Sequence, residues 1–471
     1  MQEVPRADAK AADGFNSEAV HDLRVALRRC RSMADGFRAI DPQKDWKKMR
    51  RQATALFDSL GALRDGHVMI ELVERVGPEG DPITHRLLDH LHTQESGLKG
   101  QAEIAIGDFD LKRWQSWARS LPRRAERLPV GSEVFQALAL EKLSAARRLH
   151  APAIKTKAEV AFHRLRIGLK KFRYVVENFL PQQHSEWKDG LKQVQDILGE
   201  IHDLDVLRQT LLHVCAAEPL EARQRWEQIL AHERQVRIER FCEMMSGDGS
   251  LWQVWRAGLP RGQGARQASL KKLEAWSAFL DSDLQHSHRV ARFAVQIHDN
   301  LENLDLIEGG NKSRELLKAA ALVHEVGRVD GDKNHHKTTE QMISQMDQLV
   351  GWSQQELGTM ASVARYHRGV LPHAGKLRDI PSPRRHTIKL LAGILRLANA
   401  LDAEHDGCIQ RISIDKSDGF VVIRAKGLAA DSALAERIAG ARHLLEITCG
   451  LPFLVRPLRK SPPRRRRLST H

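Results

Sequence analysis

The stretch Phe162-His-Arg-Leu-Arg-Ile-Gly-Leu-Lys-Lys-Phe-Arg-Tyr-Val-Val-Glu-Asn-Phe179 determines how the rest of the chain is interpreted. Its apolar side chains recur every three or four residues, which predicts an amphipathic helix. The apolar row consists of Leu165, Leu169, Phe172, Val176 and Phe179. A second row with the same rhythm is cationic and consists of His163, Arg166, Lys170 and Arg173. Like charges on one helix face repel each other. The row therefore favours a polyanionic ligand, although most charge runs are simply solvated faces.

Both rows also occur near the start of the chain, with the same spacing. The earlier cationic row is His21, Arg24, Arg28 and Arg31, and the earlier apolar row is Leu23, Leu27, Cys30, Ala34 and Phe37. The signature Leu60-Gly61-x-x-x-Asp65 likewise returns as Leu198-Gly199-x-x-x-Asp203. An internal repeat of this kind indicates two similar helical units. We expect them to pack as a pseudo-twofold pair, with their basic rows lining one groove.

Length and composition limit the possible partners and compartments. A chain of 471 residues favours two or three domains. The net charge of +14 favours an acidic partner such as nucleic acid, a membrane surface or polyphosphate. Five widely spaced cysteines without a CxxC pair predict free thiols. The first residues lack the apolar run of a signal peptide, and no apolar run is long enough to span a bilayer. These features predict a cytoplasmic protein.

The order of patterns predicts a mostly α fold, made of two pseudo-symmetric helical bundles and a further helical domain with a small C-terminal β-hairpin. Helix breaks are expected at Gly61, which can serve as a C-cap, and at Asp41-Pro42. Period-two stretches around Asp418-Gly419 predict the hairpin. The expected boundaries are a flexible lead-in at 1–16, repeat units at 17–128 and 134–255, a linker at 256–267, the second domain at 268–456, and a basic disordered tail at 457–471.

The first half resembles the CHAD family, the conserved histidine α-helical domains. The resemblance rests on the segments 20–29 and 162–174 and on the two Leu-Gly-x-x-x-Asp signatures, and it covers about residues 17–245. It implies paired helical bundles that bind inorganic polyphosphate. The implied binding residues are His21, Arg24, Arg28, Arg29, Arg31, His163, Arg166, Lys170, Lys171 and Arg173. Guanidinium groups suit this ligand because they make bidentate, charge-assisted contacts with phosphate oxygens. Asp65 and Asp203 are expected to cap helices or to orient basic side chains.

Histidines and carboxylates recur through the second half, in the segments 286–291, 320–327, 335–337, 364–368 and 395–402. Such residues on several helices can converge on a metal ion in a bundle core. Imidazole together with carboxylate suits Mn, Fe, Zn or Mg. A divalent metal is therefore a possible cofactor, and a bound metal lowers the pKa of a water or polarises a phosphoryl oxygen. The other interpretation is that these residues pack helices around a degenerate site.

This order resembles the HD superfamily of phosphohydrolases. It is most similar to the C-terminal HD-type domain of the exopolyphosphatase and guanosine-pentaphosphate phosphohydrolase family, over about residues 268–456. The resemblance implies His286, His324, Glu325 and Asp402 as metal ligands, the last three also being catalytic, with His336, His367 and Arg368 as accessory contacts. Two positions depart from the family. Glu325 stands where an aspartate is usual, and Thr338 stands where a further histidine is usual.

The actin-like region to which that family's exopolyphosphatase activity is attributed has no counterpart in this chain. Three hypotheses follow. The chain is a metal-dependent phosphohydrolase acting on polyphosphate or guanosine polyphosphate, or it is a non-enzymatic polyphosphate-binding or granule-associated protein with a degenerate HD-type domain. The third hypothesis is nucleic-acid binding. It is disfavoured by the aromatic content of 5% and by the absence of any reader motif.

Overall fold

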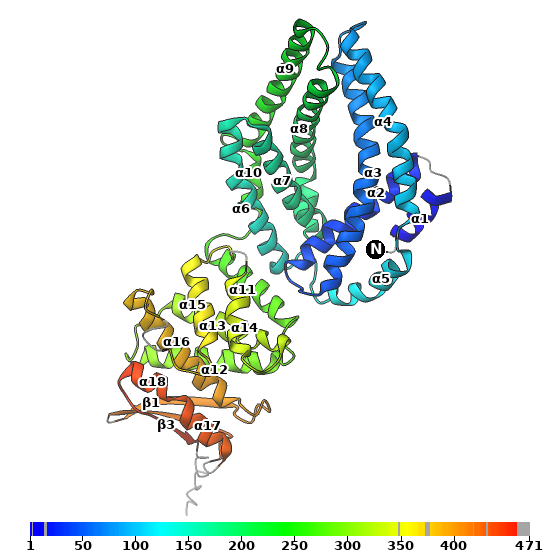
Figure 1. Ribbon diagram of the computed structural model, residues 1–471. Coiled ribbons are helices and arrows are strands. Elements are labelled where there is room, and N and C mark those ends of the chain that lie inside the picture. Colours follow the sequence, from blue (N-terminus) through cyan, green and yellow to red (C-terminus); the bar gives the residue numbers. More distant parts are fainter. Residues whose placement is uncertain are drawn as a thin grey trace, which may run out of the picture. The chain divides into compact units, whose positions relative to one another are not determined.

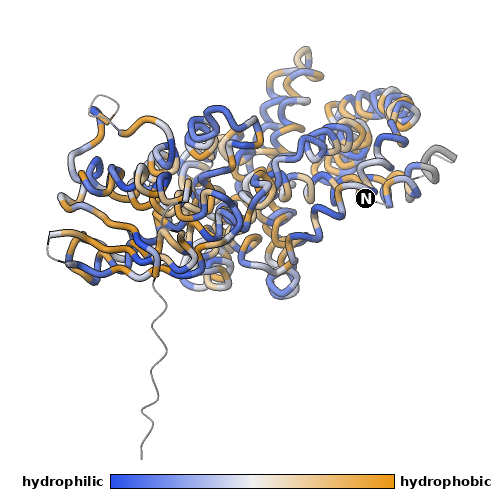
Figure 2. The backbone as a smooth tube through the Cα atoms, turned by 90° about the horizontal axis from the view of Figure 1, so that it is seen from below, coloured by the Kyte–Doolittle hydropathy of each residue, from blue (hydrophilic) through white to orange (hydrophobic). Residues whose placement is uncertain are grey.

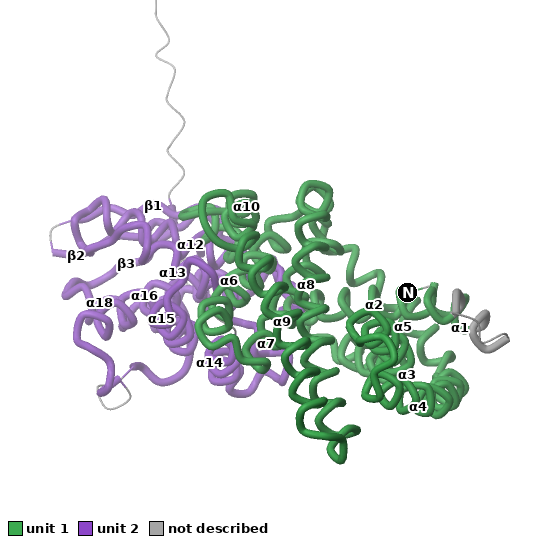
Figure 3. Tube along the Cα trace, turned by 90° about the horizontal axis from the view of Figure 1, so that it is seen from above, with its two compact units in different colours: residues 1–272 green, residues 273–471 purple. Residues whose placement is uncertain are grey.

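A computed structural model describes residues 1, 3–13, 17–346, 349–372, 377–417, 419–429 and 432–458. The chain forms two compact units, Met1–Lys272 and Leu273–His471 (Figure 3). The fold is mostly helical, and apolar and polar residues alternate along its helices (Figure 2). The predicted fold class is therefore confirmed. Within the described ranges, no helix combines the length and the apolar character that crossing a bilayer requires.

The sequence repeat appears in the first unit as two successive sets of helices (Figure 1). The first set is α1 Glu3–Asp13, α2 Ser17–Arg38, α3 Lys44–Val76, α4 Pro82–Gly107 and α5 Leu111–Ala125. The second is α6 Glu133–Thr156, α7 Glu159–Phe179, α8 Pro181–Val214, α9 Leu220–Met245 and α10 Leu251–Ala257. Helices α2, α3 and α4 correspond to α7, α8 and α9. The equivalent helices α2 and α7 pack on each other, as a twofold relation requires.

Helix boundaries differ from the expected ones at three places. Helix α1 occupies most of the stretch expected to be a flexible lead-in. Helix α11, Gly262–Ala278, begins inside the expected linker, so only residues 258–261 separate it from α10. Helix α3 continues through Gly61, where a break was expected, so this glycine does not cap the helix. A Cβ at Gly61 would lie 3.4 Å from Nη1 of Arg24. Most of the predicted basic tail, residues 459–471, lies outside the described residues.

An aromatic cluster joins the two repeats where α2 meets α7. Phe179 stacks on Phe135 with ring centroids 4.2 Å apart, and its edge meets Phe37 at 5.3 Å. Phe37 in turn stacks on Trp46 at 4.8 Å. Aromatic pairs in these geometries add about 0.5–1.5 kcal/mol each beyond the area they bury. The four rings come from α2, α3, α6 and α7, so this cluster fixes the relation between the two repeats.

Gly36 is expected to be indispensable to this contact. A Cβ at Gly36 would lie 2.3 Å from Cε2 of Phe179, which is too close without a shift of the ring. We expect Gly36→Ala to lower the free energy of unfolding by about 1–3 kcal/mol, the usual cost of overpacking. The measurement is guanidinium unfolding followed by circular dichroism.

Gly97→Ala on α4 is the matched control, because an added Cβ there meets nothing within 4 Å. It should be neutral or stabilising by up to about 1 kcal/mol, since alanine favours a helix more than glycine does. Equal unfolding midpoints for wild type and Gly36→Ala would contradict the proposed packing.

The far ends of α3, α4, α8 and α9 form a second core between the repeats. Asp81 caps α4 by accepting hydrogen bonds from the backbone N–H groups of Ile83 and Thr84. The same carboxylate accepts a hydrogen bond of 2.8 Å from Nε1 of Trp226 on α9, and it pairs with Arg225. One side chain therefore both begins a helix and joins the two repeats.

The second unit packs helices around α16 Ser382–Leu401, whose apolar side chains are buried. The other helices are α12 Leu284–Asn303, α13 Asn311–Val323, the 3-10 helix η1 Val326–Asp330, α14 His335–Ser344, α15 Gln354–Arg365, α17 Ala433–Ala441 and α18 His443–Cys449. Strands β1 Arg411–Ser417 and β2 Phe420–Lys426 form the expected antiparallel hairpin. A third strand, β3 Phe453–Pro457, pairs in parallel with β2 and was not predicted.

Candidate functional site

The cationic rows of α2 and α7 converge in the first unit. Lys170 is half-buried, and its charge interacts with Arg166 on its own helix and with Arg28 and Arg31 on α2. Burial and these like charges lower the pKa of Lys170 to about 8, although Asp65 opposes the shift. The charges that act on Lys170 come from both repeats, so side chains of both repeats share one site. We call Arg24, Arg28, Arg31, Arg166 and Lys170 the basic cluster.

Two buried guanidinium N–H groups of the basic cluster have no hydrogen-bond partner. They are Nη1 of Arg24 and Nε of Arg166. These residues are equivalent in the two repeats, so each repeat leaves one guanidinium donor unsatisfied, Nη1 in the first and Nε in the second. Leaving a buried donor unpaired costs about 1–3 kcal/mol, and more when the group is charged. The arrangement therefore suits an anion that accepts a hydrogen bond from each arginine.

Two carboxylates lie among the cations. Burial raises the pKa of Asp203 to about 6, while the charges of Arg166 and Asp65 act on it in opposite directions. Burial lowers the pKa of Arg24, and the negative charge of Asp65 partly compensates. Both aspartates lie inside continuous helices. They therefore do not cap helices. Their negative charges partly balance the nearby cations, and the expected role of orienting basic side chains stays a prediction.

Arg31 of the basic cluster and its equivalent Arg173 make contacts within the protein, whereas the two predicted histidines are exposed. Arg31 lies over the ring of Phe57 at 4.2 Å and pairs with Asp58 at 3.4 Å. Its equivalent Arg173 pairs with Glu177 at 3.6 Å and donates to Gln195. The predicted histidines His21 and His163 are exposed at the N-terminal ends of the two rows, where the His163 ring lies 5.1 Å from that of His202.

Arg29 and Lys171 are equivalent in the two repeats and do not lie with the basic cluster. Arg29 is exposed and pairs with Glu3 at 3.7 Å. Lys171 is exposed as well. Each follows a cluster residue by one position, and successive side chains on a helix point about 100° apart. The sequence prediction missed Arg64 and His202, whose matching places beside the two Leu-Gly signatures could have identified them.

The second unit contains two groups of potential metal ligands that share Glu325. One is His286, His324 and Glu325, and the other is Glu325, His335 and His367. Within each group the ligand atoms lie within 4.8 Å of one another, and all five residues are buried. A carboxylate with imidazoles on both sides can bridge two ions or hold one on either side. Glu325 also pairs with Arg328, whose Nε lies 2.6 Å from Oε2.

Hydrogen bonds at Nδ1 orient all four of these imidazoles. His324, His335 and His367 each place Nδ1 near a backbone carbonyl oxygen, at 2.7, 2.9 and 2.6 Å. The Nδ1 atom of His286 lies 2.7 Å from Oδ2 of Asp402. Because Nδ1 carries the proton in each ring, the lone pair of Nε2 is left for a cation.

The fit to a metal is supported by two further observations. The Nε2 atoms of His335 and His367 face each other at 3.3 Å, a separation at which both lone pairs could be directed at one bound cation. Burial also lowers the pKa of His324 and of His367, so both rings are neutral near pH 7, as metal ligands must be.

Asp402 lies behind His286 and not beside the other ligands. Burial alone would raise its pKa, but its hydrogen bonds with His286 and Arg289 lower it below the ordinary value. In this structure the carboxylate orients His286, and the role of Asp402 as a direct metal ligand stays a prediction. Asn399, which the prediction missed, has its Oδ1 3.0 Å from Nε2 of His286 and 3.2 Å from Nε2 of His324.

The two adjacent histidines of α14 have different surroundings. His335 faces Glu325 and His367, whereas the prediction had assigned the accessory role to His336. Burial, with the nearby charge of Arg365, lowers the pKa of His336 to about 4, and its Nδ1 is buried without a hydrogen-bond partner. The predicted accessory residue His367 lies in the second group, while Arg368 is exposed.

Comparison with known families agrees with both halves of the geometry. Residues 2–212 match the family model of the CHAD domain, and residues 265–434 match that of the Ppx/GppA phosphatase, domain III. The chain joins a CHAD domain to a Ppx/GppA domain III. The comparison with curated proteins gave no match. This pairing supports a polyphosphate-related function. The CHAD match ends within α8, although the structural repeat continues through α9 and α10.

Proposed function

We propose that the CHAD domain of this chain binds inorganic polyphosphate through the basic cluster. The observation that carries the proposal is the matched pair of unpartnered N–H groups on Arg24 and Arg166. A chain of phosphates offers an acceptor oxygen and a negative charge at every unit, so one ligand can meet both arginines. Burial and neighbouring positive charges lower the pKa of Lys170, and a polyanion would relieve the repulsion among those charges. A protein that binds polyphosphate in this way would associate with polyphosphate granules.

Polyphosphate binding should depend on pH through Lys170. In the free protein this ammonium loses its proton near pH 8, whereas a bound polyanion favours the protonated form. The affinity should therefore fall as the pH rises from 7 to 9, by up to about tenfold for a group with this pKa. The measurement is calorimetric titration of the full-length protein with long-chain polyphosphate.

Lys170→Arg is the matched variant, because arginine stays charged over this range and already occupies the equivalent position, Arg28. The variant should lose most of the change between pH 7 and pH 9. Failure of the wild type to bind polyphosphate at pH 7 in low salt would refute the proposed function. An identical pH profile for the variant would remove Lys170 from the site.

A second function, metal-dependent phosphohydrolysis in the Ppx/GppA domain III, is favoured by the two ligand groups that share Glu325. Glu325 with His286 and His324, or with His335 and His367, would hold the ion. Mn, Mg, Fe or Zn bound there would polarise a phosphoryl oxygen and lower the pKa of a water. The candidate substrates are polyphosphate and guanosine polyphosphates. If the centre holds no metal, the chain is a binding protein with a degenerate domain.

The residues around Glu325 define what the protein itself contributes to this reaction. Asp402 and the three backbone carbonyls fix the imidazole rings, so little reorganisation is needed when a cation arrives. Arg328 balances the charge of Glu325, which keeps this buried carboxylate compatible with neutral histidines. Glutamate also reaches one methylene farther than aspartate would, so its carboxylate extends between the two ligand groups.

A further inference from the structure

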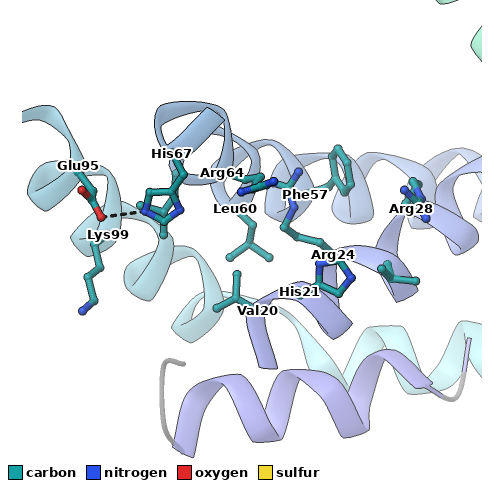
Figure 4. Close-up of a pocket in the computed structure, with 12 residues that line it drawn as sticks. Val20, His21, Arg24, Arg28, Phe57, Leu60, Arg64, His67, Glu95 and Lys99 are labelled. Carbon is teal, nitrogen blue, oxygen red and sulfur yellow. Dashed lines mark hydrogen bonds and ion pairs between the residues drawn. The ribbon is translucent and has the colours of Figure 1, made fainter. Parts of the chain in front are cut away.

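A cavity of about 450 Å³ lies between α2, α3 and α4 in the first repeat. Arg24 and Arg28 of the basic cluster line one end of it, together with Arg64. Figure 4 shows His67 and Glu95 at the opposite end, with Val20 and Leu60 facing each other between the two ends. The cavity therefore begins at the basic cluster and extends beyond it as far as His67 and Glu95.

The three zones of this cavity differ in chemistry. The cationic end suits phosphate groups. The middle is apolar, because Val20, Leu60 and Leu63 line it, and inorganic phosphate gains nothing from such a wall. At the far end lie His67, Glu95 and Lys99, with Nε2 of His67 2.8 Å from Oε1 of Glu95, so this end presents groups that accept and donate hydrogen bonds (Figure 4). A ligand that fills all three zones carries phosphates, a flat apolar body and a polar edge.

The second repeat has larger side chains at two of the positions around the equivalent space. Phe162 stands at the position equivalent to Val20, and its side chain is buried, with 2% exposure. The guanidinium of Arg234 lies over that ring at 5.5 Å, and Arg234 pairs with Asp205 at 2.6 Å. Ser96 and His67 are the equivalents of Arg234 and Asp205 in the first repeat. Val20 and Ser96 are smaller than Phe162 and Arg234, and thus leave space in the first repeat that those two side chains occupy in the second.

We propose that this cavity binds the nucleoside of a nucleoside polyphosphate, whose phosphates extend onto the basic cluster. The base would pack between Val20 and Leu60, and its edge would hydrogen-bond with Glu95. A carboxylate accepts hydrogen bonds from the amino groups that base edges present. The proposal rests on the proposed polyphosphate site for its cationic end, and it adds a class of organic ligand that inorganic phosphate alone does not represent.

The test compares ATP and GTP with inorganic tripolyphosphate, which has the same number of phosphates and no nucleoside. Full-length protein is titrated in a calorimeter with a chelator present, so that metal-dependent hydrolysis does not interfere. At least one nucleotide should bind about tenfold more tightly than tripolyphosphate, as expected for a base packed in an apolar site. Val20→Phe copies the filled repeat and should abolish this advantage without weakening tripolyphosphate. Glu95→Gln, at a half-exposed position, should reduce nucleotide binding alone.

Two results would overturn the proposal. One is wild-type protein that binds tripolyphosphate at least as tightly as both nucleotides. The other is an advantage that persists in both Val20→Phe and Glu95→Gln. If tripolyphosphate and long-chain polyphosphate bind but nucleotides gain nothing, only this inference fails. If none of these ligands binds, the proposed function fails with it.

Discussion

Replacing Arg24 and Arg166 together with alanine is expected to weaken polyphosphate binding by at least about a hundredfold. Each arginine offers a buried N–H group that has no partner within the protein. Hydrogen bonds to charged groups contribute about 1.5–3 kcal/mol each, and a factor of ten corresponds to about 1.4 kcal/mol. The measurement is titration with long-chain polyphosphate over a range of salt concentrations. The slope of log affinity against log salt should fall by about two, one for each lost phosphate contact.

Arg29→Ala with Lys171→Ala is the matched control for this experiment. It removes the same net charge from the same two helices, but from exposed positions outside the basic cluster. Exposed charges are screened by salt, so this pair should change the affinity by no more than about threefold. Equal losses in the two double variants would show that overall charge, and not the basic cluster, controls binding.

Glu325→Gln is expected to remove bound metal and to abolish phosphate release. Glu325 belongs to both ligand groups, so one substitution affects every arrangement of the ion that the centre allows. An amide is a poorer ligand than a carboxylate, and the loss of a metal that stabilises transition-state charge costs several kcal/mol. Release of phosphate from polyphosphate should drop at least about a thousandfold. Metal content by mass spectrometry and phosphate release with added Mn or Mg measure the two effects.

Glu302→Gln provides the control for the metal experiment. Glu302 forms a third group that could hold a metal, with His298 and Asp299, at a distinct place in the sequence. That variant should keep both metal and activity. Loss of metal in Glu302→Gln but not in Glu325→Gln would place the ion at α12. Stoichiometric metal in wild type without phosphate release from any polyphosphate would exclude the hydrolase hypothesis for that substrate.

The sequence predicted those features that repeat at a fixed spacing. Both cationic rows and the duplication are visible as residue types at helical intervals, and the hairpin is visible as alternation around Gly419. Contacts between distant segments were not visible in this way. Gly61 looked like a helix end, because glycine is common at C-caps, yet it lies inside the continuous helix α3, which packs against α2 and α4. Strand β3 is short and pairs in parallel with β2, and no local pattern indicates such a partner.

In the candidate metal centre, too, the sequence did not show which individual side chains contact one another. The sequence placed two adjacent histidines at the start of α14, but only the phase of that helix decides that His335 and not His336 faces Glu325. Asn399 lies in the last turn of α16 and Asp402 directly follows the helix, and a carboxylate is the more obvious ligand of the two. The structure assigns Asp402 to His286 and Arg289, and it places Asn399 between the imidazoles.

The packing of α2 on its own equivalent, α7, has a consequence for ligand direction. Inorganic polyphosphate has the same covalent structure in both directions. A site with pseudo-twofold symmetry therefore contacts identical groups whichever way the polymer enters. A single nucleic-acid strand runs from 5′ to 3′, and two equivalent half-sites would meet it in opposite senses. The duplicated helices thus suit a polymer without direction. The two half-sites differ at Val20, whose equivalent is Phe162. This difference makes one end of the site distinguishable from the other.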